Sequence, residues 1–282
     1  MKVRAIKKVL SRKFNEFTDS IPDEKVKEAV TQHGIIAGGA IASLLLGQKV
    51  NDYDIYFDNL EAAKRVGQYY INLFNDKSEY GVTLEEEEGR IKIKVAGGAA
   101  GEEIAEEDDL PLRSLLELGG LGVNLDEEAE AYVPRFITEN AISLIGDIQL
   151  IMLFQDQPLE LIQRFDFVHC RCYWIPGGEL VLPPESILSI LTQDLKYVGN
   201  DYPLHSLIRV RKYLRRGWFI SAGELLKIAV KLNELDLMDV ETLQNQLMGV
   251  DVAYFREMWS MIDDLNGQLT PPALYDIIDS VF

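Results

Sequence analysis

Hydrophobic residues recur every three or four positions through most of the first 75 residues, and two short apolar runs interrupt this spacing. The spacing is typical of amphipathic helices, and the short runs are typical of buried strands. The pattern therefore predicts a helical stretch over 1–33 with a break before Pro22, a strand over 35–37, a helix over 40–46, a strand over 52–57 and a helix over 59–75. Residues that favour helix ends support these limits: Asp23 and Asn59 at starts, and Gly47 at an end.

The pattern changes between residues 78 and 130. Residues 90–95 alternate charged and apolar side chains as an exposed or edge strand would, but acidic runs at 85–88 and 102–109 surround them. We interpret the segment as a solvated, partly disordered insertion. The alternative is an acidic surface on which a basic protein partner docks.

From residue 132 the pattern of short apolar runs returns, and after Pro183-Pro184 the spacing is helical to residue 282. The expected strands cover 133–137, 141–144, 148–154, 164–174 and 179–182, with a short helical link over 158–163. The expected helices cover 185–195, 203–216, 221–234, 239–247, 251–265 and 271–281. This order predicts an α/β domain over 1–184 and an all-helical domain over 185–282.

Composition narrows the function classes. A formal charge of -18 argues against nonspecific coating of nucleic acid, because the mean field of the chain repels phosphate. Any nucleotide or nucleic-acid contact must then use metal ions or a local basic patch. No apolar run is long enough to cross a bilayer, and residues 1–17 lack the apolar core of a signal peptide. Cys170 and Cys172 would lie about 6.6 Å apart on one face of a strand, a poor disulfide geometry that fits a reducing cytoplasm.

Two carboxylates stand out on the predicted strand over 52–57. Asp52 and Asp54 are separated by one residue, so alternation along the strand puts both side chains on the same face. Such a pair is costly unless cations share the site, and hard oxygen ligands favour magnesium. The sequence therefore predicts a magnesium site at this strand.

A third carboxylate, Asp166, lies between two phenylalanines in the predicted strand over 164–174. An unpaired charge on an apolar strand would be costly, so this residue needs a partner. It could be a third metal ligand. It could also be a buried aspartate that is satisfied by backbone groups or by an arginine such as Arg164.

A local basic patch is present on the predicted helix over 203–216. Its five cations are Arg209, Arg211, Lys212, Arg215 and Arg216. Residues three and four apart share a helix face. One stripe therefore consists of Arg209, Lys212 and Arg216, and a second consists of Arg211 and Arg215. The patch could balance the charge of a phosphate, and a solvated charged helix is the alternative. Tyr213 or Trp218 could stack on a base, although aromatic residues at this spacing are more often part of the core.

Three motifs resemble the signature of the DNA polymerase β-type nucleotidyltransferase superfamily. They are Ala37-Gly38-Gly39, then after twelve residues Asp52-Tyr53-Asp54-Ile55, and finally Phe165-Asp166-Phe167. Residues 164–174 also resemble nucleotidyltransferase-like proteins encoded by tailed phages, which would place the protein in the host cytoplasm. The helix over 203–216 is loosely similar to the segment that follows the catalytic domain in tRNA CCA-adding and poly(A) enzymes.

The resemblance implies an α/β (α+β) nucleotidyltransferase palm with a mixed sheet, followed by the helical domain. It implies transfer of a nucleoside monophosphate from an NTP such as ATP to a hydroxyl of an RNA 3′ end (a tRNA-like RNA), a protein or a small molecule. Asp52, Asp54 and Asp166 would hold two Mg²⁺ ions, and Asp166 would also help to activate the attacking hydroxyl.

The resemblance also assigns the nucleotide-binding residues. The Gly38-Gly39 turn would bring backbone N–H groups close to the triphosphate. Many members carry a serine after the glycine pair; this chain has Ala40 there and Ser43 one helical turn later. The remaining expected nucleotide-binding residues are Arg209, Arg211 and Lys212.

A non-catalytic interaction protein that retains the scaffold is the competing hypothesis, with a role in phage assembly or host takeover and the acidic insertion as its binding surface. Intact acids at all three positions favour the enzyme, because a site without catalysis has no reason to keep a costly cluster of carboxylates.

Overall fold

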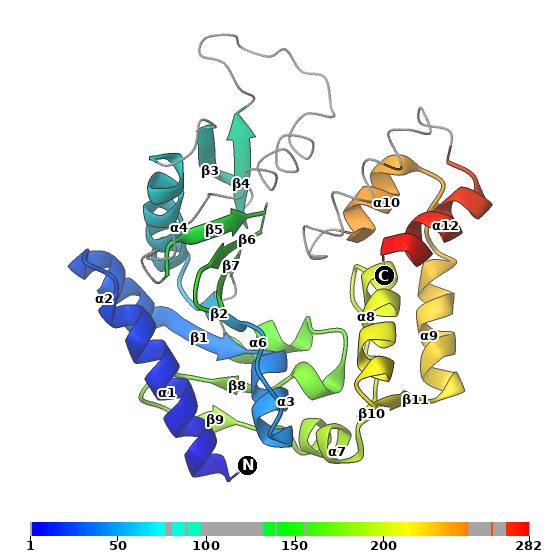
Figure 1. Cartoon of the computed structure of the whole chain (residues 1–282), viewed down its shortest axis with the longest axis horizontal. Coiled ribbons are helices and arrows are strands. Elements are labelled where there is room, and N and C mark those ends of the chain that lie inside the picture. Colours follow the sequence, from blue (N-terminus) through cyan, green and yellow to red (C-terminus); the bar gives the residue numbers. More distant parts are fainter. Residues whose placement is uncertain are drawn as a thin grey trace. The chain divides into compact units, whose positions relative to one another are not determined.

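The computed structural model describes residues 2–76, 81–87, 90–96, 132–138, 140–154, 157–247, 261 and 269–281. The chain divides into two compact units. The first contains Met1–Gln163 and Cys170–Pro183, and the second contains Arg164–His169 and Pro184–Phe282. The first is built around a mixed sheet, and the second consists mainly of helices (Figure 1).

The main sheet of the first unit has the strand order β5-β6-β7-β2-β1-β8-β9. The strands are β1 Gly34–Ala37, β2 Tyr53–Phe57, β5 Pro134–Ile137, β6 Ala141–Leu144, β7 Ile148–Phe154, β8 Tyr173–Trp174 and β9 Leu180–Val181. Strands β2 and β7 pair in parallel, whereas the other neighbours in this sheet are antiparallel. The predicted mixed α/β sheet is therefore confirmed.

The helices of the first unit begin and end close to the predicted residues. They are α1 Val3–Asp19, α2 Glu24–His33, α3 Gly39–Leu46, α4 Leu60–Asn75 and α6 Pro158–Gln163. Asp23 caps α2 by accepting from the N–H groups of two first-turn residues, and Asn59 caps α4 by accepting from Ala62 N–H at 2.9 Å. Gly47 ends α3 in the left-handed conformation, with φ at +72°. The local capping signals of the sequence thus set these helix limits.

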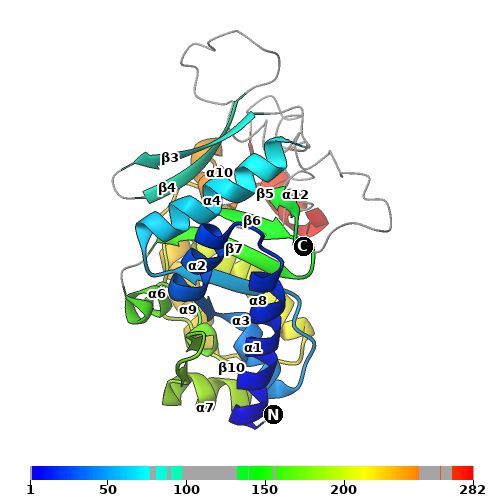
Figure 2. The same ribbon diagram turned by 90° about the vertical axis from the view of Figure 1, so that its left-hand side faces the viewer.

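Helix α1 packs along the sheet beside β1, β8 and β9 (Figure 1), and it lies on the side of the first unit that faces the viewer in Figure 2. Its apolar stripe is fully buried and consists of Ile6, Leu10, Phe14 and Phe17. The Phe14 ring meets the Trp174 ring edge-on with centroids 5.8 Å apart. Since burial of one such side chain contributes about 1.5–3 kcal/mol, this stripe fixes the helix to the sheet.

Gly34 is held between α1 and α2, and only a residue without a side chain fits there. A Cβ added to Gly34 would lie 2.6 Å from the carbonyl oxygen of Val30 and 3.2 Å from a ring carbon of Phe14. We expect Gly34→Ala to lower the free energy of unfolding by about 1–3 kcal/mol, because backbone or ring must shift to admit the methyl group. Urea unfolding measures the change. The matched control is Gly223→Ala, whose Cβ would meet nothing nearer than 3.9 Å; equal losses in both variants would contradict this explanation.

Residues 81–96 differ from the expected solvated insertion. Strands β3 Gly81–Glu87 and β4 Arg90–Ala96 form an antiparallel two-stranded sheet, with Val82, Ile91 and Ile93 buried. Lys94 forms an ion pair with Glu85 at 2.6 Å, so part of the acidic run is neutralised within the fold. The rest of the predicted insertion, including the acidic run at 102–109, lies outside the described residues.

The second unit contains five described helices with named bounds and one small parallel sheet. The helices are α7 Pro184–Thr192, α8 Pro203–Arg215, α9 Ala222–Leu232, α10 Val240–Leu247 and α12 Pro271–Val281. The sheet pairs β10 Asp194–Leu195 with β11 Phe219–Ile220, so the prediction of an all-helical second half is wrong in this detail. The predicted helix over 251–265 falls, except for Met261, outside the described residues. None of the helices in the described part of the chain is long and apolar enough to cross a bilayer.

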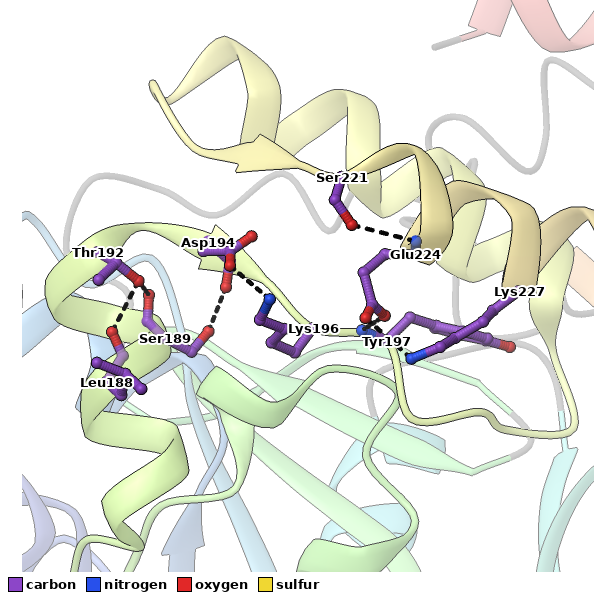
Figure 3. Close-up of polar contacts among 9 residues, drawn as sticks. All are labelled: Leu188, Ser189, Thr192, Asp194, Lys196, Tyr197, Ser221, Glu224 and Lys227. Carbon is purple, nitrogen blue, oxygen red and sulfur yellow. Dashed lines mark hydrogen bonds and ion pairs between the residues drawn. The ribbon is translucent and has the colours of Figure 1, made fainter.

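Polar contacts hold the small sheet between α7 and α9 (Figure 3). Ser189 donates to the carbonyl oxygen of Asp194 at 2.5 Å. The buried Glu224 carboxylate accepts from the N–H of Tyr197 at 2.8 Å and from Lys227 at 2.9 Å. Since Glu224 lies in the first turn of α9, its carboxylate also suits the positive end of that helix.

The predicted strand over 164–174 is wrong. Only Tyr173–Trp174 is extended in the sheet, and Val168–Cys170 forms one turn of 3₁₀ helix. Residues 166–168 belong to the second unit and pair there with residues 196–198: Val168 N–H donates to the carbonyl oxygen of Lys196, and Val198 N–H donates to the carbonyl oxygen of Asp166. The alternating pattern therefore does not mark one long strand: Arg164–His169 belong to the second unit, and the chain returns to the first unit at Cys170.

Candidate active site

The Gly38-Gly39 turn connects β1 to α3 beside the start of β2. Ala37, the last residue of β1, pairs with Asp54 on one side and with Tyr173 on the other. Gly38 has φ at +91° and ψ at −148°, and its N–H donates to the carbonyl oxygen of Cys172 at 3.1 Å. A Cβ at Gly38 would lie 3.5 Å from Asp54 Oδ2. The Asp54 carboxylate therefore lies against this turn, and glycine leaves room beside it.

Helix α3 presents an open N-terminus at the same place. Its cap residue, Gly38, has no side chain to bond the first-turn N–H groups, and the first turn contains no acidic residue. These N–H groups and the positive end of the helix dipole are suited to an anion. Ala40 offers no hydroxyl at the position where members of the superfamily that the motifs resemble often have one; it is buried, while Ser43 is half-buried one turn later.

The two carboxylates differ in exposure. Strand β2 alternates as predicted, with Tyr53, Ile55 and Phe57 buried and the two residues between them half-buried. Asp54 is one of these half-buried residues. Asp52 precedes the strand by one residue and is exposed, so the strand begins at 53 and not at the predicted 52.

A polar row extends from Asp54 across the sheet. Asp54 is paired with Gln149 of β7, which in turn is paired with Ser143 of β6, and all three are half-buried. Sequence reasoning missed Gln149 and Ser143, because their position beside Asp54 depends on the parallel pairing of strands that are far apart in the chain. A pattern of single polar residues within the apolar runs of β6 and β7 was the one available hint.

Asp166 has two side-chain partners within the second unit. It is 2% exposed, and its carboxylate accepts from Arg209 Nη1 at 2.7 Å and from Ser206 Oγ at 3.0 Å. Satisfaction by an arginine was one of the two sequence interpretations, and the arginine is Arg209 and not Arg164. Among the described residues, no group of three or more His, Cys, Asp or Glu side chains is arranged to hold a metal ion. The role of Asp166 as a third metal ligand stays a prediction.

The Asp166 carboxylate fixes the direction of the Arg209 guanidinium. Arg209 Nη2 also donates to the hydroxyl of Tyr213 at 3.3 Å, and the guanidinium carbon lies 6.0 Å from the centre of that ring. The Arg209 side chain remains 31% exposed, so a cation is held in one orientation at the surface of the unit. Of the other predicted cations, Arg211 pairs with Asp279 of α12 at 3.9 Å, and Lys212 is exposed.

Aromatic side chains bury His169 behind this ion pair. The His169 ring lies 4.5 Å from the Tyr213 ring and 4.4 Å from the Trp218 ring, measured between centroids. Both aromatic residues are themselves buried, so they belong to the core of the unit and do not offer a free face to a base. Burial, with the nearby Arg209 charge as the second cause, lowers the pKa of His169 to about 3.

The buried His169 should make the second unit sensitive to acid. The folded protein keeps this histidine neutral down to a pKa of about 3, whereas the unfolded chain takes up a proton below about 6.5. The contribution of neutral His169 to the free energy of unfolding is therefore fully present above pH 6.5. It is lost as the pH falls toward 3, by about 1.4 kcal/mol per pH unit. We expect His169→Gln to flatten the pH dependence of the unfolding free energy between pH 6.5 and 5 by about 2 kcal/mol in urea titrations. An unchanged pH dependence would contradict the burial of a neutral histidine.

A comparison with protein-family models places this fold in a family. Residues 8–193 match the model of Gad2, described as a Gabija anti-defense 2 family protein. The matched range covers well over half of the chain and includes the glycine turn, Asp52, Asp54 and Asp166. The chain belongs to the Gabija anti-defense 2 family. A search of curated proteins found no match to this Gabija anti-defense 2 chain.

Solved structures similar to the Gabija anti-defense 2 chain include CCA-adding enzymes. The Thermotoga maritima enzyme complexed with tRNA is 11% identical, with 95% of this chain and 53% of that chain covered and a TM-score of 0.42. The Bacillus stearothermophilus enzyme in complex with CTP is 13% identical, with 87% and 51% covered and a TM-score of 0.42. A further CCA-adding enzyme with CTP is 12% identical, with 96% and 57% covered and a TM-score of 0.45. The chain thus spans about half the length of these enzymes.

Proposed function

We propose that this anti-defense protein is a magnesium-dependent nucleotidyltransferase that transfers a nucleoside monophosphate from an NTP to a hydroxyl group and releases pyrophosphate. The observation that carries the proposal is the position of the Asp54 carboxylate against Gly38, at the open N-terminus of α3. A carboxylate oxygen suited to a metal ion and a helix end suited to an anion lie there side by side, which supports phosphoryl transfer.

The donor chemistry of the turn fits magnesium. Asp52 and Asp54 offer hard carboxylate oxygens, and Gly38 leaves open the space that a Cβ would fill 3.5 Å from Asp54 Oδ2. We assign these two aspartates as the ligands. When bound, Mg²⁺ would neutralise triphosphate charge and lower the pKa of the attacking hydroxyl. A third-ligand role for Asp166 would require its carboxylate to leave or share the Arg209 ion pair.

The nucleotide would bind with its phosphates at the first turn of α3. The backbone N–H groups after Gly38-Gly39 would donate to phosphate oxygens, and Ser43 would add a hydroxyl one turn later. The cations that the resemblance assigns to the nucleotide are Arg209, Arg211 and Lys212. Gln149 and Ser143 extend the polar row away from Asp54 and would contact the acceptor.

The family name supports a target within the Gabija defence. We infer that the acceptor hydroxyl belongs to a protein or an RNA of that system, so that nucleotidylation inactivates it. A non-catalytic protein that binds its target through the retained scaffold is the second candidate. The observation that favours it is the Asp166–Arg209 ion pair, which occupies the third carboxylate of the expected metal site.

Transfer of label separates the two candidates. The full chain is incubated with each α-labelled NTP and Mg²⁺, with and without purified Gabija components, and pyrophosphate release and labelled products are measured. We expect pyrophosphate release with at least one NTP and label on one component. Absence of NTP binding and of pyrophosphate release with both Mg²⁺ and Mn²⁺ would contradict the enzyme and leave the binding protein.

A further inference from the structure

Helix α1 concentrates positive charge in a strongly acidic chain. Six basic residues occur before its first acidic residue, Glu16, in a protein of net charge -18. They are Lys2, Arg4, Lys7, Lys8, Arg12 and Lys13. Such a local reversal of sign needs an explanation, either within the fold or through a partner.

Two of these cations have roles inside the fold. Lys7 Nζ donates to the carbonyl oxygen of Gly178 at 3.0 Å, and Lys13 Nζ lies over the ring of Tyr132, 5.3 Å from its centre. Contacts of this kind are ordinary surface packing. These contacts account for Lys7 and Lys13, which flank the buried apolar stripe of the helix, and leave the other basic residues unexplained.

Three further cations form a stripe that points away from the core. Arg4, Lys8 and Arg12 are all exposed, and their spacing of four residues aligns them on one face of α1. We call these three residues the α1 stripe. Within this stripe Arg12 pairs with Glu16 at 3.7 Å, and the two side chains are 72% and 52% exposed. A pair so exposed contributes about 0–1 kcal/mol, so it does not explain the stripe.

Helix stability does not explain the α1 stripe either. The stripe begins in the first turn, where the helix dipole disfavours positive charge by about 0.3–1 kcal/mol per cation. The first turn of α1 lacks an acidic residue and its last turn lacks a basic one. Helix α8 has the opposite arrangement, with Lys212 and Arg215 in its last turn, where the dipole favours them. Arg4 thus opposes the stability of its own helix, and Lys8 and Arg12 lie beyond the first turn, where the dipole neither favours nor disfavours them.

We propose that the α1 stripe binds the phosphate backbone of a nucleic acid. With a rise of 1.5 Å per residue its three cations span about 12 Å, a length over which one strand presents several phosphates. The polar residues Ser11 and Asn15 lie on the same face and can donate to phosphate oxygens. A local patch of this kind supplies the attraction that the net charge of the chain opposes.

An anionic membrane and an acidic protein fit the α1 stripe less well than a nucleic acid does. A membrane-surface helix inserts its apolar face, but the apolar face of α1 is fully buried against the sheet. A protein partner is usually anchored by aromatic or large apolar side chains, whereas the positions between the stripe residues on this face are small and polar. The binding needs neither NTP nor metal, so it is independent of the proposed transfer reaction.

Fluorescence anisotropy tests the stripe with the full chain in the absence of NTP and divalent metal. The probes are a labelled 30-nucleotide single-stranded RNA and a labelled 30-base-pair DNA duplex, which distinguish the two sources of backbone phosphate. The variant Arg4→Gln/Lys8→Gln/Arg12→Gln should bind the preferred probe about 100-fold more weakly at about 0.1 M salt. Its salt dependence, as the slope of log K against log salt, should be shallower by about 2.

The matched control removes the same charge elsewhere. Lys25→Gln/Lys27→Gln/Lys231→Gln changes three cations of α2 and α9, and we expect its affinity to stay within about threefold of the original chain. A second variant, Arg4→Lys/Arg12→Lys, should retain most of the binding because it keeps the charges.

Circular dichroism and the melting temperature separate binding from folding. Loss of the stripe should leave the melting temperature unchanged or raise it slightly, since the dipole disfavours the first-turn cation Arg4 and the three side chains are exposed. Three results would each overturn the proposal: equal loss of affinity in the stripe variant and the matched control, no binding of either probe by the original chain, or binding to phosphatidylserine vesicles alone.

Discussion

Replacing Asp54 by Asn should lower the rate of nucleotidyl transfer by about 1000-fold or more. Asn keeps the size of the side chain beside Gly38 but removes the negative charge that a divalent cation needs. Loss of about 4 kcal/mol of metal-mediated stabilisation of the transition state corresponds to this factor. The measurement is kcat for pyrophosphate release at saturating NTP and Mg²⁺, together with the rise in melting temperature that NTP and Mg²⁺ produce.

The matched control for this variant is Asp58→Asn. Asp58 follows the other end of β2, where its carboxylate contacts His33 Nδ1 at 2.8 Å, so the chemical change is the same at a distance from the turn. We expect its kcat to stay near that of the original protein. The assignment of Asp54 fails if Asp54→Asn retains its activity, or if Asp58→Asn loses as much.

Replacing Arg209 by Gln should destabilise the second unit by about 2–3 kcal/mol. The substitution leaves the buried Asp166 carboxylate with Ser206 as its remaining side-chain donor, and an uncompensated buried charge is costly. This value is below the range of about 3–5 kcal/mol for fully buried pairs because Arg209 is partly exposed, and solvent screens its charge. Urea unfolding followed by tryptophan fluorescence reports the change, since Trp218 lies in the same unit.

The double variant Asp166→Asn/Arg209→Gln should recover part of this loss, with an interaction energy of about 1–3 kcal/mol. Arg215→Gln, on the exposed side of the same helix, is the matched control and should leave stability unchanged. A different result would favour the metal-ligand role. If Asp166→Asn abolishes transfer while the unfolding free energy of Arg209→Gln equals that of the original chain, the ion pair is not what holds Asp166.

The sequence was informative where local chemistry determines structure. Asp23, Asn59 and Gly47 cap helices through bonds within a few residues, so their positions set helix limits that the structure confirms. The glycine turn and the alternation along β2 are likewise short-range features. These elements define the Asp54 side of the candidate site almost completely.

The features that could not be predicted depend on partners far apart in the chain. The 164–174 segment alternates like a strand, but Asp166 is satisfied by Arg209, more than forty residues later. Gln149 joins the polar row through a parallel pair whose strands are joined by a long connection. The two-residue strands β10 and β11 are too short to leave a periodic signal.

The path of Arg164–His169 has a consequence for modularity. The chain enters the second unit with this segment, returns to the first for Cys170–Pro183, and enters the second unit again at Pro184. A fragment that starts at Pro184 would lack the carboxylate that orients Arg209 and the Phe167 and His169 rings that fill its core. Exchange of the second unit between relatives in the laboratory would therefore have to carry these six residues along with the helices.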